Sequence, residues 1–256
     1  MTAPIAVPIP HRGAVLVGCA GWSLPRSEQE RFPQAGSHLE RYASRFRAVE
    51  INSSFHRPHR PSTYARWSSS VPAGFLFSVK IPKTITHAQR LREAGELLET
   101  FLSEASGLGD RLGCLLVQLP PSLSFEEPVA SAFFADLRAR TAGTVVCEPR
   151  HPTWFTPEAD GLLRELEVAR VAADPACVPE AAEPGGWRGV TYHRLHGSPR
   201  IYSSAYSEAD LAALAEKIRG ESEDGRTVWC IFDNTTLGAA TGNGLELASL
   251  LTRDKG

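Results

Sequence analysis

Residues 113–154 read GCLLVQLPPSLSFEEPVASAFFADLRARTAGTVVCEPRHPTW. An apolar run at Cys114–Leu119 is followed by a helical pattern over Pro128–Arg140, where apolar residues recur at three- and four-residue spacing. A second apolar run follows at Val145–Glu148. Short buried strands that alternate with amphipathic helices are typical of a parallel sheet with crossover helices. This stretch therefore predicts one strand–helix–strand unit of an α/β fold.

The same alternation continues toward both ends of the chain. Further helical patterns cover Leu91–Ser106, Pro157–Leu166 and Glu208–Arg219, the last preceded by Ser207, a residue suited to capping a helix. Residues 175–187 are too rich in Pro and Gly for a long helix, and they predict an irregular crossover after the sixth strand. The predicted strands are Val15–Cys19, Ala48–Ile51, Phe75–Val79, Cys114–Leu119, Val145–Glu148, Arg170–Ala173, Val190–His196 and Val228–Phe232.

Eight such units in 256 residues predict a single (β/α)8 TIM barrel with a closed parallel sheet, since about 250 residues are typical of that fold. We expect this one domain to span residues 13–256. Residues 1–12 contain three prolines and are expected to form a loose lead-in.

The composition is that of an ordinary globular protein, with 42% hydrophobic residues, 22% charged residues and a formal net charge of −2. This balance argues against nucleic acid as a partner but leaves it open. The chain shows no secretory signal pattern, and no apolar run approaches the ~18 residues of a membrane helix. A cytoplasmic protein without membrane contact is expected. The five cysteines form no CxxC pair and are expected to be small buried thiols.

Polar residues gather on one side of the predicted strands, near their C-terminal ends. Alternate residues of a strand face opposite sides, and α/β proteins bind their ligands at the carboxyl ends of the strands. The alternative to a ligand-binding pocket is that these residues form balanced ion pairs that only stabilise the core. Burial of many ionisable groups costs free energy, however, and such groups more often belong to a functional site. The residues predicted to line this pocket are Glu50, Asn52, Lys80, Gln118, Glu148, Arg150, Asp174, Arg194, His196 and Asn234.

Seven motifs at these strand ends occur in a characteristic order: GCAGWS (18–23), VEINSSFHRP (49–58), FSVKIPKTITH (77–87), LLVQLPPS (115–122), CEPRHPTW (147–154), YHRLHG (192–197) and FDNTTLGAATGN (232–243). They resemble the DUF72 (YecE-like) family. The resemblance implies a barrel of the β/α type and brings no established reaction with it. The chain departs from the family's usual residues at His56, Asp233 and Gly244, where Tyr, Asn and Ala are usual. Its substrate preference is therefore expected to differ from that of its relatives.

An acid–base enzyme that needs no metal and acts on a small polar, anionic or phosphorylated substrate is the leading hypothesis. Glu50 and Glu148 are candidate proton-transfer groups, because two carboxylates among cations can have well-separated pKa values. His196 can carry a proton near neutral pH. The sequence indicates no cofactor and leaves a metal open. The remaining pocket residues are expected to bind the substrate. The cations Lys80, Arg150 and Arg194 would bind its negative charge. The other substrate-binding candidates are Asn52, Gln118, Asp174 and Asn234.

Two other classes of function stay open. A metal-dependent hydrolase or isomerase would use Glu148, Asp174 and His196, with His56 or His87, although no HxH or HExxH spacing is present. A nucleic-acid-binding module would use residues 55–67, where basic and aromatic residues interleave. Against that module, Tyr64 and Trp67 are expected to pack a helix onto the core.

Two smaller features concern the same strand ends. A lysine inside a barrel, such as Lys80, can lose its proton and attack a carbonyl group, but Glu50 on the preceding strand predicts a salt-bridged ammonium instead. Glycine-rich turns are predicted at residues 197–200 and 237–244, where many barrels bind phosphate. Glycine is also common in such turns for backbone reasons alone.

Overall fold

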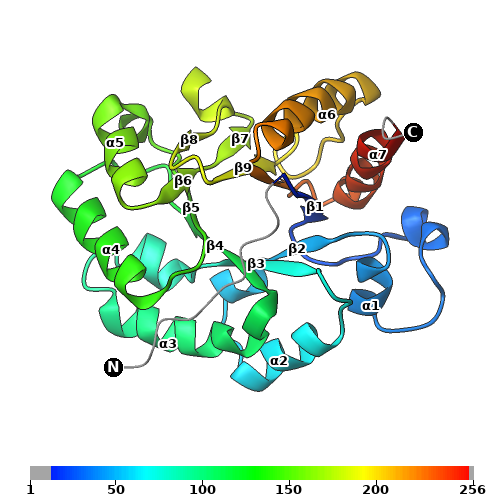
Figure 1. The fold of residues 1–256 in the computed structure, drawn as a ribbon, viewed down its shortest axis with the longest axis horizontal. Coiled ribbons are helices and arrows are strands. Elements are labelled where there is room, and N and C mark those ends of the chain that lie inside the picture. The colour runs from blue at the N-terminus through cyan, green and yellow to red at the C-terminus, as the bar shows by residue number, and fades with distance from the viewer. Residues whose placement is uncertain (1–12, 254–256) are drawn as a thin grey trace.

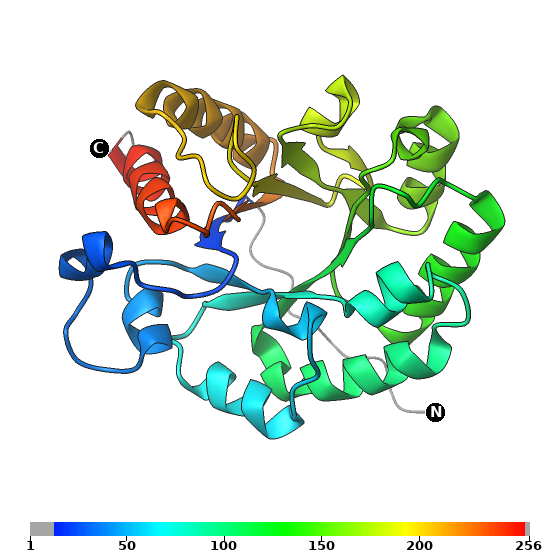
Figure 2. The ribbon, with the colours of Figure 1, turned by 180° about the vertical axis from the view of Figure 1, so that it is seen from behind.

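The computed structural model describes residues 13–253, and its helices lie around the outside of the strands (Figure 1; Figure 2 shows the same arrangement from behind). The predicted lead-in at residues 1–12 lies outside the described residues. The strands are β1 Val15–Cys19, β2 Ala48–Ile51, β3 Leu76–Lys80, β4 Leu112–Gln118, β5 Val145–Glu148, β6 Val168–Arg170, β7 Ala172–Asp174, β8 Gly185–Gly186, β9 Val190–Leu195 and β10 Thr227–Phe232. The helices are α1 His38–Ala43, α2 Pro61–Ser69, α3 Gly95–Ala105, α4 Glu127–Arg140, α5 Pro157–Glu165, α6 Glu208–Glu223 and α7 Ala239–Arg253.

The strands form an α/β fold with two sheets that are parallel except for one short antiparallel pair. One sheet has the order β1-β10-β9-β7 and the other the order β2-β3-β4-β5-β6-β8, in which β6 and β8 are antiparallel. The predicted closed sheet of eight strands is therefore not shown. Val171 divides the predicted sixth strand, since β6 pairs with β5 whereas β7 pairs with β9. On the opposite side, Ala20 and Glu50 form a single isolated bridge between the two sheets.

One helix begins later than predicted, because the backbone before it has a non-helical conformation. The helix expected from Leu91 begins only at Gly95, because Arg90, Leu91 and Glu93 have φ values of 51°, 68° and 48°, in the left-handed region that a helix excludes. The α6 cap is confirmed: Ser207 Oγ accepts a hydrogen bond from the backbone N–H of Asp210, whose carboxylate accepts one from the N–H of Ser207. The crossover after the sixth strand is irregular, as predicted, with one 3-10 turn at Pro179–Ala182.

Two apolar layers hold the strands. The larger packs the outward faces of the strands against the helices, and Phe77, Val117 and Phe134 are fully buried in it. The smaller is enclosed on the other side of the strands and consists of Leu16, Ala48, Leu76, Cys114, Leu116, Val146, Ala169, Val171, Val190, Tyr192, Trp229 and Ile231. Its members define which side of each strand faces inward. Nearer the C-terminal ends of the strands, the same inward faces carry the polar residues.

Four of the five cysteines are buried thiols, as predicted, and Cys177 is exposed in the loop after β7. Burial raises the pKa of Cys19 to about 12, so this thiol stays protonated. Among the helices of residues 13–253, none is both long enough and apolar enough to span a bilayer.

The two sheets approach each other closely at Gly18 in β1. A Cβ atom added there would lie 2.2 Å from the carbonyl oxygen of Ala48 in β2. We predict that Gly18→Ala lowers the free energy of unfolding by about 1–3 kcal/mol, the usual effect of overpacking a rigid contact. Urea denaturation measures this change.

Gly161→Ala in α5 is the matched control, since no atom of the described residues lies within 4 Å of an added Cβ there. Alanine favours a helix over glycine by up to about 1 kcal/mol, so this variant should be unchanged or slightly stabilised. Equal behaviour of the two variants would contradict a close approach of β1 and β2.

Candidate functional site

Arg194, in β9, is the centre of a buried group of charges, and its side chain is 1% exposed. Its Nη2 lies 2.8 Å from Glu50 Oε1 and its Nε lies 3.0 Å from Glu50 Oε2, a bidentate pair. Its Nη1 donates to Glu148 Oε2 at 3.0 Å, and Nη2 also lies 2.9 Å from Asp233 Oδ2. One guanidinium thus holds three carboxylates, which come from β2, from β5 and from the residue after β10.

His196 and Arg150 complete the group, which we call the Arg194 cluster: Glu50, Glu148, Arg150, Arg194, His196 and Asp233. The two ring nitrogens of His196 lie 3.0 Å from Glu148 Oε1 and 3.0 Å from Asp233 Oδ2. Arg150 Nη2 lies 2.8 Å from the same Glu148 oxygen, and the Arg150 side chain is 25% exposed. Arg150 is therefore the member that reaches the surface.

The charges of the cluster shift one another's ionisation. Burial acts to raise the pKa of Glu148, but the charges of Arg194, His196 and Arg150 outweigh it and hold that pKa well below its ordinary value. The pKa of Asp233 is lowered in the same way, against burial, by Arg194 and His196. Burial acts to lower the pKa of His196, but Glu148 and the hydrogen bonds from Asp233 and Glu148 raise it above its ordinary value. The imidazolium is thus favoured, and three positive groups face three carboxylates.

Lys80, at the end of β3, lies beside the cluster without pairing with it. The predicted salt bridge to Glu50 is wrong, because Arg194 and the hydroxyl of Tyr192 already occupy both Glu50 oxygens. Lys80 forms no ion pair within 4.0 Å among residues 13–253, and its Nζ lies 3.9 Å from the centre of the Phe55 ring. Burial, and then the charge of Arg194, lower the pKa of Lys80 to about 8, although the three carboxylates act in the opposite direction.

The structure brings together six of the ten residues predicted to line the pocket: Glu50, Lys80, Glu148, Arg150, Arg194 and His196. It adds Asp233, which the strand pattern missed. We expected Asn234 to point inward, but Trp229 and Ile231 face inward in β10, so Asp233 shares their side. Every residue of TVWCIF in β10 is apolar or small, so alternation offered no signal there.

The other four predicted residues lie outside the cluster. Asn234 Nδ2 donates to Ser204 O at 2.9 Å and so braces the loop between β9 and α6. Asp174 lies off the inward side, since Ala173 is the residue that pairs with Arg194, and it accepts a hydrogen bond from Tyr206. Gln118 pairs in register with Glu148 but makes its hydrogen bond to Leu119 O. Asn52 Oδ1 is buried without a hydrogen-bond partner within the described part of the chain.

The alternative functions find less support in this geometry. Between residues 13 and 253, no three His, Cys, Asp or Glu side chains are grouped so as to hold a metal ion. The Asp174 carboxylate accepts a hydrogen bond from the Tyr206 hydroxyl. In the proposed nucleic-acid surface, Tyr64 is fully buried and Trp67 packs against Trp22 with ring centroids 5.1 Å apart. These rings therefore attach α2 to the core. The second predicted glycine-rich turn is mostly helix, because α7 begins at Ala239.

Tyr202 covers the outer side of the cluster. It has a φ of 66°, which is unusual for a residue other than glycine, and its ring meets the His196 ring edge-on at 5.6 Å. Its hydroxyl accepts a hydrogen bond from Arg150 Nη1 at 3.3 Å. The side chain is among the few exposed large apolar ones, at 40%. Tyr202 and Arg150 are thus the partly exposed side chains at this side of the cluster.

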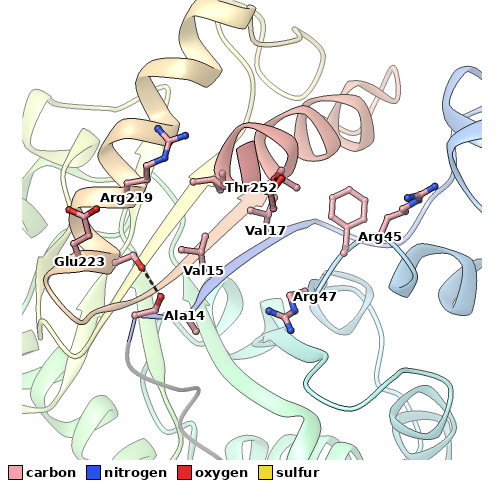
Figure 3. Close-up of a pocket in the computed structure, with 13 residues that line it drawn as sticks. Ala14, Val15, Val17, Arg45, Arg47, Arg219, Glu223 and Thr252 are labelled. Carbon is pink, nitrogen blue, oxygen red and sulfur yellow. Dashed lines mark hydrogen bonds between the residues drawn. The ribbon is translucent and has the colours of Figure 1, made fainter. Parts of the chain in front are cut away.

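A cavity of about 580 Å³ lies elsewhere, between β1, α6 and α7 (Figure 3). Its walls combine Val15 and Val17 with the arginines Arg45, Arg47 and Arg219. Val17 belongs to the helix-facing core layer, so this cavity is on the outer side of the strands. The carboxyl ends of the strands, where ligands bind in α/β proteins, instead carry the Arg194 cluster.

Comparison with known proteins identifies relatives over nearly the whole chain. The profile of a family described as "Protein of unknown function DUF72" matches residues 16–256. UPF0759 protein YecE of Escherichia coli K12 is 32% identical over 176 residues, which are 66% of this chain and 62% of that protein. The matched part is thus less than two thirds of the length of the E. coli relative. UPF0759 protein YunF of Bacillus subtilis 168 is 21% identical over 93% of this chain and 94% of that protein.

Two solved structures of DUF72 family proteins are similar in fold. The one from Thermotoga maritima MSB8 has a TM-score of 0.77 and 24% identity, and covers 93% of this chain and 99% of its own. The one from Enterococcus faecalis V583 also has a TM-score of 0.77, with 20% identity and coverage of 93% and 95%. The resemblance seen in the sequence motifs is thereby confirmed.

Removal of Arg194 tests its role as the counter-charge of the cluster. Arg194→Met leaves Glu50, Glu148 and Asp233 buried without their shared partner, so we predict a loss of about 3–5 kcal/mol in the free energy of unfolding. Arg92→Met is the control, since Arg92 pairs with Glu126 at an exposed position and should matter by at most about 1 kcal/mol. Similar losses in the two variants would show that the buried charges are not mutually dependent.

Replacement of Asp233 tests the ionisation of His196. Asp233→Asn keeps the shape but removes a negative charge that favours the imidazolium, so the pKa of His196 should fall. In the wild type, the raised pKa stabilises the fold below the ordinary histidine pKa, and this stabilisation is lost as pH rises through the raised value. The Asp233→Asn variant should lose this stabilisation at a lower pH than the wild type does. NMR titration of the imidazole signals measures the shift, with His196→Gln for assignment, and an unchanged titration would contradict the contact.

Proposed function

The chain belongs to the DUF72 family, and we propose that it is an enzyme that performs acid–base chemistry on a small anionic substrate held at the outer side of the Arg194 cluster. The observation that carries the proposal is the surplus of positive charge. Within the cluster, the charges of Arg194, Arg150 and the favoured imidazolium match three carboxylates, and Lys80 stands beside them as a further cation. A negatively charged ligand would balance it.

Arg150 is the proposed anion-binding group, and Lys80 lies near it. Arg150 is partly exposed, and its guanidinium can bind a carboxylate or phosphate through two parallel hydrogen bonds. His87 supports the placement of the two cations at one opening: burial first, and then the charges of Lys80 and Arg150, lower the pKa of His87. Its ring packs edge-on against Phe55, which in turn lies under Lys80 Nζ. Lys80, Phe55 and His87 are thus neighbours, and the charge of Arg150 acts on the same imidazole.

His196 and Glu148 are the proposed proton carriers. They lie 3.0 Å apart, and Arg150 Nη2 is 3.1 Å from His196 Nε2, so a substrate on Arg150 would be adjacent to both. Glu50 has both oxygens occupied by Arg194 and Tyr192, and in this proposal it positions Arg194. No step of this scheme requires a metal, because the cations supply the charge that would stabilise an anionic intermediate.

The proposal extends to the fold around the site. β6 and β7 follow each other with only Val171 between them, and Ala20 bridges to Glu50 on the other side. These two junctions support a single barrel-like domain over residues 13–256, in which the two sheets act as one. The Arg194 cluster would then fill the end of this barrel at which the strands have their carboxyl ends.

Anion binding is the first test of this function. Inorganic phosphate, malonate and pyruvate are titrated into the protein and followed by isothermal calorimetry and amide NMR shifts. We predict saturable binding of at least one of them, with a Kd that Arg150→Ala raises about tenfold to a hundredfold, the effect of losing a charged hydrogen bond. Arg92→Ala should leave it unchanged. Absence of binding by any anion, or equal effects of the two variants, would overturn the anion site.

Proton exchange is the second part of the same test. Small anionic carbonyl and carboxylate compounds are incubated with the protein in D₂O, and uptake of deuterium at carbon is followed by NMR. Glu148→Gln and His196→Asn should each abolish this uptake, while the variants still bind the anion. Exchange that is unaffected by both substitutions would overturn their assignment as proton carriers.

A further inference from the structure

Lys80 is a buried amine that, among residues 13–253, has no carboxylate partner of the kind that buried lysines usually have. The residue is 6% exposed and stands at the carboxyl end of β3. Its Nζ has no carboxylate within 4.0 Å among the described residues, and its close contact is the face of the Phe55 ring at 3.9 Å. A contact with an aromatic ring holds an ammonium group less firmly than a buried carboxylate does.

The three carboxylates nearby cannot turn toward Lys80 without breaking other bonds. Glu50 is held by both arms of the Arg194 guanidinium, and Glu148 receives hydrogen bonds from Arg194, Arg150 and His196. Asp233 is bonded to Arg194 and His196. The three carboxylates are therefore already engaged by Arg194, Arg150 and His196, and the neighbouring Arg194 charge repels a second cation. A lysine that is desolvated and placed near another cation is an activated nucleophile.

From this arrangement we propose that Lys80 forms an imine with the carbonyl carbon of its substrate, and that the substrate is a small aldehyde or ketone that also carries a carboxylate or phosphate. The carbonyl would lie on Lys80 and the anionic group on Arg150. This inference rests on the proposed function, because the anion site on Arg150 orients the carbonyl. It adds to that function the identity of the nucleophile and the class of the substrate.

The proposed step balances without an oxidant or a reductant. The neutral Nζ attacks the carbonyl carbon, a C–N bond forms, and the carbonyl π electrons move to oxygen, which takes up a proton. The resulting hydroxyl leaves as water with one further proton, while the amine proton freed on addition returns to the medium. The net change is amine plus carbonyl plus one proton to iminium plus water. The iminium withdraws electrons from the adjacent carbon, so the proton there becomes accessible to the proton carriers Glu148 and His196.

Reductive trapping tests this inference on the intact protein. Sodium borohydride reduces an imine to a stable secondary amine, which mass spectrometry detects and peptide mapping locates. The probes are pyruvate and dihydroxyacetone phosphate, with acetone as a carbonyl compound that has no anionic group. The chain has four lysines, so the modified position is readily identified. We expect one adduct per chain, at Lys80, at least ten times faster with an anionic probe than with acetone.

Two variants sharpen the result. Lys80→Arg keeps the positive charge but cannot form an imine, and it should abolish the adduct. Lys83→Arg alters an exposed lysine three residues away and should leave trapping unchanged. Thermal unfolding of both variants verifies that they fold, and the peptide map of the wild type decides the question if Lys80→Arg does not fold. Absence of an adduct with every probe, or labelling of Lys83 and Lys217 as fast as Lys80, would overturn the inference.

A third variant separates this inference from the proposed function. Arg150→Ala should reduce trapping of pyruvate to the level of acetone, while trapping of acetone stays the same. If Lys80 is trapped equally well in Arg150→Ala, the nucleophile stands and the anion site fails. If anions bind at Arg150 and deuterium exchange occurs but no adduct forms on Lys80, the acid–base function stands and the imine is wrong.

Discussion

The guanidinium of Arg194 is a full charge in the interior of the protein, and burial of such a charge is tolerated only when it is paired and fully hydrogen-bonded. Its three carboxylate partners come from both sheets. Glu50 and Glu148 belong to the six-stranded sheet, whereas Arg194 and Asp233 belong to, or directly follow, strands of the four-stranded sheet. The cluster therefore joins the two sheets where the backbone pairing is interrupted. Positions of the strand ends, and hence of every group at the site, depend on it.

Pairing within the cluster determines which groups are left for chemistry. Each carboxylate already has its partners, so these groups hold geometry first, and a proton can move only along existing contacts such as the one between Glu148 and His196. Lys80 and Arg150 differ, since within residues 13–253 the first has no carboxylate within 4.0 Å and the second reaches solvent. The proposed anion would therefore meet a cluster whose charges are balanced, with Lys80 beside it as an additional cation. Electrostatic preorganisation of this kind needs no reorganisation when charge develops on a substrate.

The layer beneath the cluster explains why the charges gather at one end. Tyr192 and Trp229 stack with ring centroids 5.9 Å apart, and Leu76, Leu116 and Ile231 fill the space around them. The Tyr192 hydroxyl is the junction between the two layers, because it donates to Glu50 while its ring packs with the apolar residues. Water is thus excluded from below the cluster, which strengthens each ion pair within it.

Alternation of polar and apolar residues along the sequence predicted the strands and placed Glu50, Lys80, Glu148, Arg194 and His196 on the inward side. It failed at β10, where every side chain is apolar or small and the inward position of Asp233 is invisible, and at Asp174, where the break at Val171 changes the geometry of the strand. It also paired Lys80 with Glu50, since it could not count the competing partners of each carboxylate.

The sequence by itself determined the α/β fold, the family and most residues at the strand ends, because these follow from local periodicity and from motifs in order. Only the tertiary structure decided which charges pair. That choice depends on distances between side chains of strands far apart in the chain. In the part of the chain that the structure describes, one buried guanidinium takes three carboxylates and leaves the lysine beside it without one.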